Sequence, residues 1–155
     1  MKYFASDLWK MLNSEDHDAR QQANQKWKKA SDDYSNYFDT IKNKLSKIFI
    51  SLYYRYDGFH DAPIKNICIE NVKYNRCNIQ IAIELGGKPY VLTYGGVQGY
   101  KLYVPVDRYY WLGGVMSWGY GEFELTDDCL WNHRILCEVG CEFDILCKKI
   151  SLKKL

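Results

Sequence analysis

Apolar and polar side chains follow a helical period through the first third of the chain. Over residues 19–52 the apolar side chains recur every three or four positions, which is the stripe of an amphipathic helix. The stripe is long enough for one helix, or for two helices with a break at residues 44–46, and we expect the break. A shorter helix, capped by Ser6 and running through residue 12, is predicted first, and Ser14 offers an N-cap for the longer one.

Beyond an Asp-Gly pair at residues 57–58, which suits the end of a helix, the period of the pattern falls to two. Pro63 disfavours a return to helix, and alternating apolar and polar residues are typical of strands. Gly86-Gly87 predicts a tight hairpin. Residues 105–121 are punctuated by four glycines and are interpreted as a loop. The predicted strands cover residues 64–72, 79–85, 90–94, 100–104, 123–125, 135–139 and 143–150.

The predicted strands follow one another without intervening helices, so a parallel sheet built from βαβ units is not indicated. The predicted fold is α+β, with N-terminal helices packed on a mainly antiparallel β-sheet. A chain of 155 residues has the size of one domain. We therefore expect a single domain over residues 1–155, with a helical part at 1–58 and a sheet part at 63–150.

The composition narrows the choice of partner and compartment. Hydrophobic residues make up 47% and charged residues 26% of the chain, as in globular proteins, and the net charge is only +2. So small a charge argues against a nucleic-acid or anionic-membrane partner. The sequence shows no export signal and no apolar run of the ~20 residues that cross a bilayer. These features favour a cytoplasmic protein without membrane attachment.

The chain has six cysteines, and none of them forms a C-x-x-C pair. Without that spacing a zinc site is not indicated, and in a cytoplasmic protein the thiols are expected to be reduced. No P-loop, G-x-S-x-G or H-E-x-x-H motif occurs. We expect no metal and no cofactor.

Aromatic residues are abundant, with 14 Tyr and 5 Trp, and eight rings lie within residues 100–123. Seven acidic residues against Arg134 then give residues 122–144 a local charge of minus six. Tyr and Trp dominate binding hot spots because they offer large contact area at little rotamer entropy. Alternatively, the rings form core at one end of the sheet and the acids are solvent-facing strand positions. The partner-binding hypothesis rests on Tyr109, Tyr110, Trp111, Trp118, Tyr120, Glu122, Glu124, Asp127 and Asp128.

Two histidines carry the alternative hypothesis of an enzyme. His60 precedes Asp61 where the helices give way to the sheet, and a carboxylate can orient an imidazole that acts as a general base. Neighbours in an extended chain point to opposite sides, however, so the pair is more typical of a turn. His133 is expected just before the strand that starts at residue 135. A small hydrolase or nuclease would need His60, Asp61 and His133 to converge.

Several short motifs resemble those of small uncharacterised bacterial proteins of the immunity-protein type, which belong to polymorphic toxin systems. They are residues 1–4, 8–9, Trp27, Tyr34, 56–61 (Tyr-Asp-Gly-Phe-His-Asp), 118–123 (Trp-Gly-Tyr-Gly-Glu-Phe) and 133–136 (His-Arg-Ile-Leu). The resemblance implies a cytoplasmic protein that neutralises a toxin or effector protein by stoichiometric binding. The acidic run suits a basic toxin domain. A phage-encoded inhibitor would have the same kind of surface, and the oligomeric state stays open.

Overall fold

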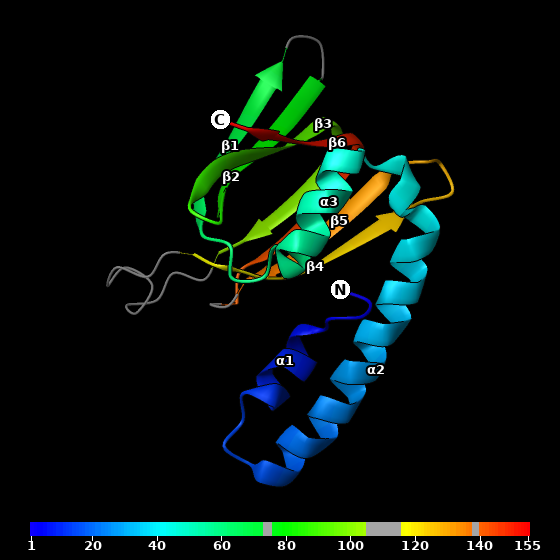
Figure 1. The fold of residues 1–155 in the computed structure, drawn as a ribbon, viewed down its shortest axis with the longest axis vertical. Coiled ribbons are helices and arrows are strands. Elements are labelled where there is room, and N and C mark those ends of the chain that lie inside the picture. Colours follow the sequence, from blue (N-terminus) through cyan, green and yellow to red (C-terminus); the bar gives the residue numbers. More distant parts are fainter. Residues whose placement is uncertain (73–75, 105–115, 138–139) are drawn as a thin grey trace.

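The computed structural model describes residues 1–72, 76–104, 116–137 and 140–155. Helices come first and strands follow, which confirms the predicted α+β fold with an antiparallel sheet. Figure 1 shows α1 and α2 as a hairpin that extends away from the sheet. The helical elements are α1 (Ser6–Leu12), α2 (His17–Ile41), the 3₁₀ turn η1 (Lys42–Lys44), α3 (Lys47–Arg55) and the 3₁₀ turn η2 (Asp57–Phe59). The strands are β1 (Ile64–Val72), β2 (Arg76–Leu85), β3 (Lys88–Tyr103), β4 (Trp118–Leu125), β5 (Trp131–Cys137) and β6 (Glu142–Lys154).

Polar side chains at the helix starts explain where the helices begin. Ser46 accepts a hydrogen bond from the backbone N–H of Phe49 at the start of α3, so the predicted break at residues 44–46 is confirmed. The cap of α2 is Asp16, whose carboxylate accepts from the N–H groups of Asp18 and Ala19. Ser14 lies two residues too early to cap α2, and its hydroxyl instead accepts from the N–H of Asp16.

The six strands form one sheet in the order β1-β2-β3-β6-β5-β4, with every neighbouring pair antiparallel. Gly86 and Gly87 have φ of 55° and 72° in the β2–β3 hairpin, as the sequence predicted. The expectation of separate strands at 90–94 and 100–104 was wrong. They are parts of the 16-residue strand β3, which continues through Gly96 at φ 62° and an irregularity between Val97 and Gly99.

The predicted loop over residues 105–121 was wrong at its end, because β4 already begins at Trp118, whereas residues 105–115 lie outside the described part of the chain. Gly121 lies within this strand because a larger residue would not fit. A Cβ on Gly121 would lie 3.1 Å from Nε2 of His133 and 3.2 Å from a Trp118 ring carbon. His133 lies inside β5, two residues after its start, where it pairs with Phe123 across the ladder. The predicted strand start at residue 135 was therefore four residues late.

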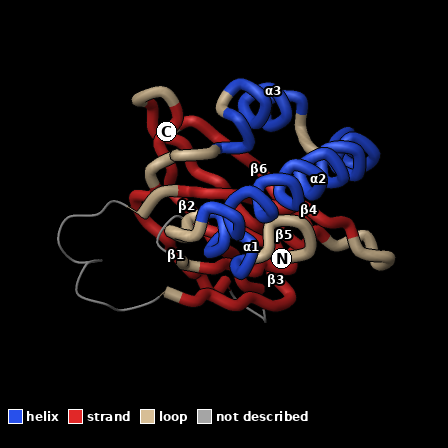
Figure 2. Tube along the Cα trace, turned by 90° about the horizontal axis from the view of Figure 1, so that it is seen from below, coloured by secondary structure: helices blue, strands red, loops and turns tan. Residues whose placement is uncertain are grey.

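The sheet curls until segments next to its two edge strands meet. The N–H of Asp61 donates to the carbonyl of Trp118, whose own N–H donates to Ala62, and Ile64 donates to Met116. Strand edges with unpaired N–H groups can pair with other chains, so proteins cover them. Here α2 runs beside β4 (Figure 2), and its tyrosines cover part of the β4 edge.

One hydrophobic core joins the helices to the sheet. Phe49 and Tyr53 of α3 pack on Phe59 and on Phe123, which itself stacks on the ring of His133 at 3.7 Å between centroids. Phe49, Phe59 and Phe123 are almost wholly buried. This cluster fixes the position of the turn that follows α3, and with it one side of the site described next.

Candidate functional site

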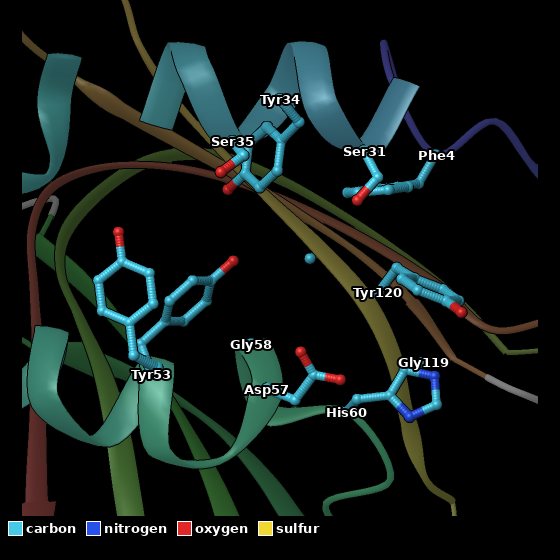
Figure 3. A pocket seen from close by; sticks show the side chains of 12 residues that line it. Phe4, Ser31, Tyr34, Ser35, Tyr53, Asp57, Gly58, His60, Gly119 and Tyr120 are labelled. Carbon is cyan, nitrogen blue, oxygen red and sulfur yellow. The ribbon is translucent and has the colours of Figure 1, made fainter. Parts of the chain in front are cut away.

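A cavity of about 210 Å³ lies between α2, the turn after α3 and the first half of β4. Figure 3 shows side chains from these three elements around it, with Phe4 from the N-terminal segment. Segments far apart in the sequence thus meet at one opening. The described lining residues are Phe4, Ser31, Tyr34, Ser35, Tyr53, Tyr54, Asp57, Gly58, His60, Gly119, Tyr120 and Gly121.

Helix α2 contributes one face through positions i, i+3 and i+4, which lie together on a helix. These are Ser31, Tyr34 and Ser35, and both serines are exposed whereas Tyr34 is buried. The hydroxyl of Tyr34 accepts the backbone N–H of Phe123 at 2.8 Å. Tyr37 does the same for Leu125 at 3.1 Å. These two bonds tie α2 to the β4 edge and hold the cavity wall in place.

The turn after α3 is in an unusual backbone conformation. Asp57, Phe59 and Asp61 have φ of 44°, 70° and 60°, beside Gly58 at 67°. Side chains disfavour this left-handed region, most of all a bulky one such as Phe. Phe59 is held there because its ring is wholly buried in the core. Such strained backbone occurs preferentially at functional sites, and here it presents Asp57 and His60 to the cavity (Figure 3).

Three tyrosines of the cavity, Tyr34, Tyr53 and Tyr120, have a raised pKa and stay protonated at neutral pH. Burial raises the pKa of Tyr53 to about 12, and the charge of Asp57 adds to the effect. Burial also raises the pKa of Tyr34 well above its usual value. For Tyr120 the causes are burial and then the negative charges of Asp57 and Asp61. The hydroxyls can therefore act as neutral donors and acceptors in a region of negative potential.

Glu122 organises the N-terminal segment that completes the cavity. Its carboxylate is 2% exposed and accepts the backbone N–H groups of Lys2 at 2.8 Å and of Tyr3 and Phe4 at 2.6 Å. The anchored Phe4 then stacks on Tyr120, with ring centroids 5.2 Å apart. Glu122 thus acts inside the molecule.

The predicted partner-binding residues separate into three groups. Tyr109, Tyr110 and Trp111 lie outside the described residues. Trp118 is fully buried and Glu122 nearly so, and the expectation that these two side chains face outward is therefore wrong. The alternation that places Trp118 and Phe123 on the inner face of β4 is interrupted by an irregularity between Trp118 and Tyr120, which sequence inspection did not anticipate.

The remaining four predicted residues are at least partly accessible. Tyr120 is half-buried and lines the cavity, and Asp127 and Asp128 are exposed in the turn between β4 and β5. Glu124 is paired with Arg134 at 2.9 Å, and the same guanidinium also approaches Glu122 at 3.8 Å and Asp144 at 3.4 Å. Three of the seven acids in the run thus share one arginine, which weakens the acidic field that the sequence suggested.

Two other tyrosines of the aromatic stretch do face outward. Tyr100 is 50% and Tyr103 53% exposed on β3. Partners from β2 end at Val97, so among the described residues the last part of β3 pairs with β6 alone. We name residues 98–103 the β3 edge. It is separated by β6 and β5 from β4 and its acidic turn, so the aromatic and acidic groups do not form one patch.

The three residues of the enzyme hypothesis do not converge. His60 Nδ1 lies 2.9 Å from the carboxylate of Asp61, so these sequence neighbours meet, contrary to expectation, because Asp61 takes a left-handed backbone conformation. His133 is wholly buried, and its Nδ1 lies 2.7 Å from the hydroxyl of Tyr94. Burial lowers its pKa well below the usual value. His133 lines neither cavity that His60 lines.

Sequence inspection missed most of the cavity residues. Asp57 was interpreted only as part of a helix end, and Phe4, Tyr34 and Tyr53 were not expected to share a site. Within the described ranges, no three His, Cys, Asp or Glu side chains are placed to hold a metal ion. Over the same ranges no helix has the length and apolarity needed to cross a membrane.

Comparison with known proteins adds no assignment. No family model matches the chain, and no curated protein matches it at a significant level. The β3 edge and the cavity are therefore the two features of this chain from which a function can be inferred.

Proposed function

We propose that this chain is a non-catalytic protein-binding module, an immunity protein or inhibitor that neutralises a toxin or effector protein by stoichiometric binding in the cytoplasm. The observation that carries the proposal is the β3 edge. Its backbone pairs on one side only within the described part of the chain, and Tyr100 and Tyr103 stand exposed along it. An unpaired edge can accept a strand from another protein, with side chains beside it supplying specificity.

The chemistry of the edge favours protein as the ligand. Tyrosines bury large areas at low entropic cost, and Val104, the residue after β3, is a further exposed apolar side chain. The exposed carboxylates of Asp127 and Asp128, although two strands away from β3, would attract a basic partner during encounter. A basic toxin domain is the partner class that combines these features.

The test is co-purification of the tagged chain with the product of the neighbouring gene, expressed together. We expect a one-to-one complex with the wild type. Tyr100→Lys with Tyr103→Lys should abolish it, since charge on an edge strand opposes pairing. Ile48→Lys is the matched control, because Ile48 is 68% exposed on α3 and lies outside the β3 edge. Equal capture by the double variant, or no complex at all, would contradict the proposal.

A further inference from the structure

The cavity beside α2 is electrostatically one-sided. Of its twelve described lining residues, none is Lys or Arg, Asp57 is the one carboxylate, and His60 is the one imidazole, with its Nδ1 2.9 Å from the carboxylate of Asp61. Figure 3 shows the carboxylate of Asp57 directed toward the cavity. Among the described residues this carboxylate has no hydrogen-bond or ion-pair partner. An acceptor directed into a concave site whose lining has no Lys or Arg is available for a ligand that carries positive charge.

Aromatic rings form much of the remaining wall. Phe4 lies 5.2 Å from Tyr120 and 5.5 Å from Tyr34 between ring centroids, and Tyr53 completes the opposite side. A cation within about 6 Å of such rings is attracted by their quadrupoles, and more strongly where water is excluded. The rings and the carboxylate around this opening therefore both attract a cation.

The charge pattern also excludes other ligand classes. An anion would meet Asp57 without a Lys or Arg to neutralise it, and the described carboxylates and histidines do not form a metal-binding group. The hydroxyls of Ser31 and Ser35 face the same space and can accept N–H groups (Figure 3). These requirements are met by an organic ammonium or guanidinium group.

The geometry is fixed before any ligand arrives. Asp57 sits at φ 44° in the strained turn, the adjacent Phe59 is wholly buried, and Phe4 is anchored through the backbone bonds to Glu122. A preformed site loses little conformational entropy on binding.

We propose that this cavity is a binding site for an organic cation, with Asp57 as the counter-ion and Phe4, Tyr34 and Tyr120 as the aromatic walls. The site is separate from the β3 edge and goes beyond the protein-binding function proposed above. The cationic group belongs either to a Lys or Arg side chain of a partner or to a small free amine.

The experiment is a titration of the ¹⁵N-labelled full chain, followed through the amide signals of Gly58, Gly119 and Gly121, which line the cavity. The probes are choline, its neutral isostere 3,3-dimethyl-1-butanol, and blocked tripeptides Gly-Lys-Gly, Gly-Arg-Gly and Gly-norleucine-Gly. Saturable shifts in these signals are expected with the cations and not with the neutral compounds. Tighter binding of the Lys or Arg peptide than of choline assigns the cation to a protein side chain, and the reverse order assigns it to a small amine.

Variants make the test specific. Asp57→Asn keeps a residue that tolerates left-handed backbone, and it should weaken cation binding about fivefold to tenfold. Asp127→Asn removes another exposed acid, from the β4–β5 turn, and should change affinity less than twofold. Saturation by the neutral compounds, unchanged affinity in a folded Asp57→Asn chain, or no saturable shift with any cation would overturn the proposal. None of these measurements involves a toxin or effector protein, so they test the cation site whether or not the β3 edge binds a partner.

Discussion

Replacing Glu122 by Gln tests whether a single buried carboxylate anchors the N-terminal segment. The carboxylate accepts three backbone N–H groups and lies 3.8 Å from Arg134. Glutamine keeps one oxygen, enough for the N–H groups of Tyr3 and Phe4, but turns an amide N–H₂ toward the N–H of Lys2. One buried donor then loses its partner and the other bonds lose their charge.

The magnitude follows from these losses. A hydrogen bond to a charged group contributes about 1.5–3 kcal/mol, and an unpaired buried donor costs about 1–3 kcal/mol. We expect Glu122→Gln to lower the free energy of unfolding by about 2–3 kcal/mol. At roughly 2–4 °C per kcal/mol for a chain of this size, the melting temperature should fall by about 4–12 °C.

The assay is urea unfolding followed by tryptophan fluorescence, with hydrogen exchange at residues 2–4. Glu124→Gln is the matched control, since Glu124 is 38% exposed and its pair with Arg134 is worth about 0.5 kcal/mol. The amides of residues 2–4 should exchange faster only in the Glu122 variant. Equal stability of the two variants, with unchanged exchange, would refute the anchoring role.

Three further predictions concern the sheet and its thiols. Gly121→Ala should destabilise the fold by about 1–3 kcal/mol through overpacking, whereas Gly99→Ala, with open space around its Cβ, should change the unfolding free energy by less than about 0.5 kcal/mol. Burial lowers the pKa of His133, so below pH 6.5 the unfolded chain binds a proton at this residue and the folded chain does not. Stability should therefore fall as pH drops below 6.5, by up to about 1.4 kcal/mol per unit, and His133→Gln should lack this contribution in urea titrations. Thiol labelling of the folded chain should be fast at exposed Cys129 and slow at Cys147, where burial raises the pKa to about 12; equal rates would contradict this.

The fold was largely predictable because its signals are local. The helical stripe, the cap at Ser46 and the glycines of the β2–β3 hairpin each act within a few residues. The start of β4 escaped prediction because Gly119 and Gly121 resemble loop residues. Gly121 is needed for space beside His133 and Trp118, which only the folded sheet brings there.

The candidate site was less predictable because its residues depend on long-range contacts. The presence of an aromatic residue in the sequence does not indicate whether its ring faces inward, as that of Trp118 does, or outward, as that of Tyr103 does. The alternation of inward and outward side chains along a strand could have suggested which β4 residues face inward. The irregularity between Trp118 and Tyr120 breaks that alternation, however. The left-handed backbone of Phe59 has no signal in its residue type, and it is this conformation that sets the direction of Asp57 and His60.

Glu122 also connects stability to the cation site. Its side chain does not line the cavity, yet it holds the backbone of Phe4, whose ring stacks on Tyr120. Freed from that anchor, Phe4 would leave the wall, so Glu122→Gln should weaken choline binding although no lining residue has changed. Glu124→Gln, which leaves the N-terminal segment anchored, should bind choline like the wild type. Undiminished binding in a Glu122→Gln chain whose residues 2–4 exchange freely would mean that Asp57 and the tyrosines hold the cation without Phe4.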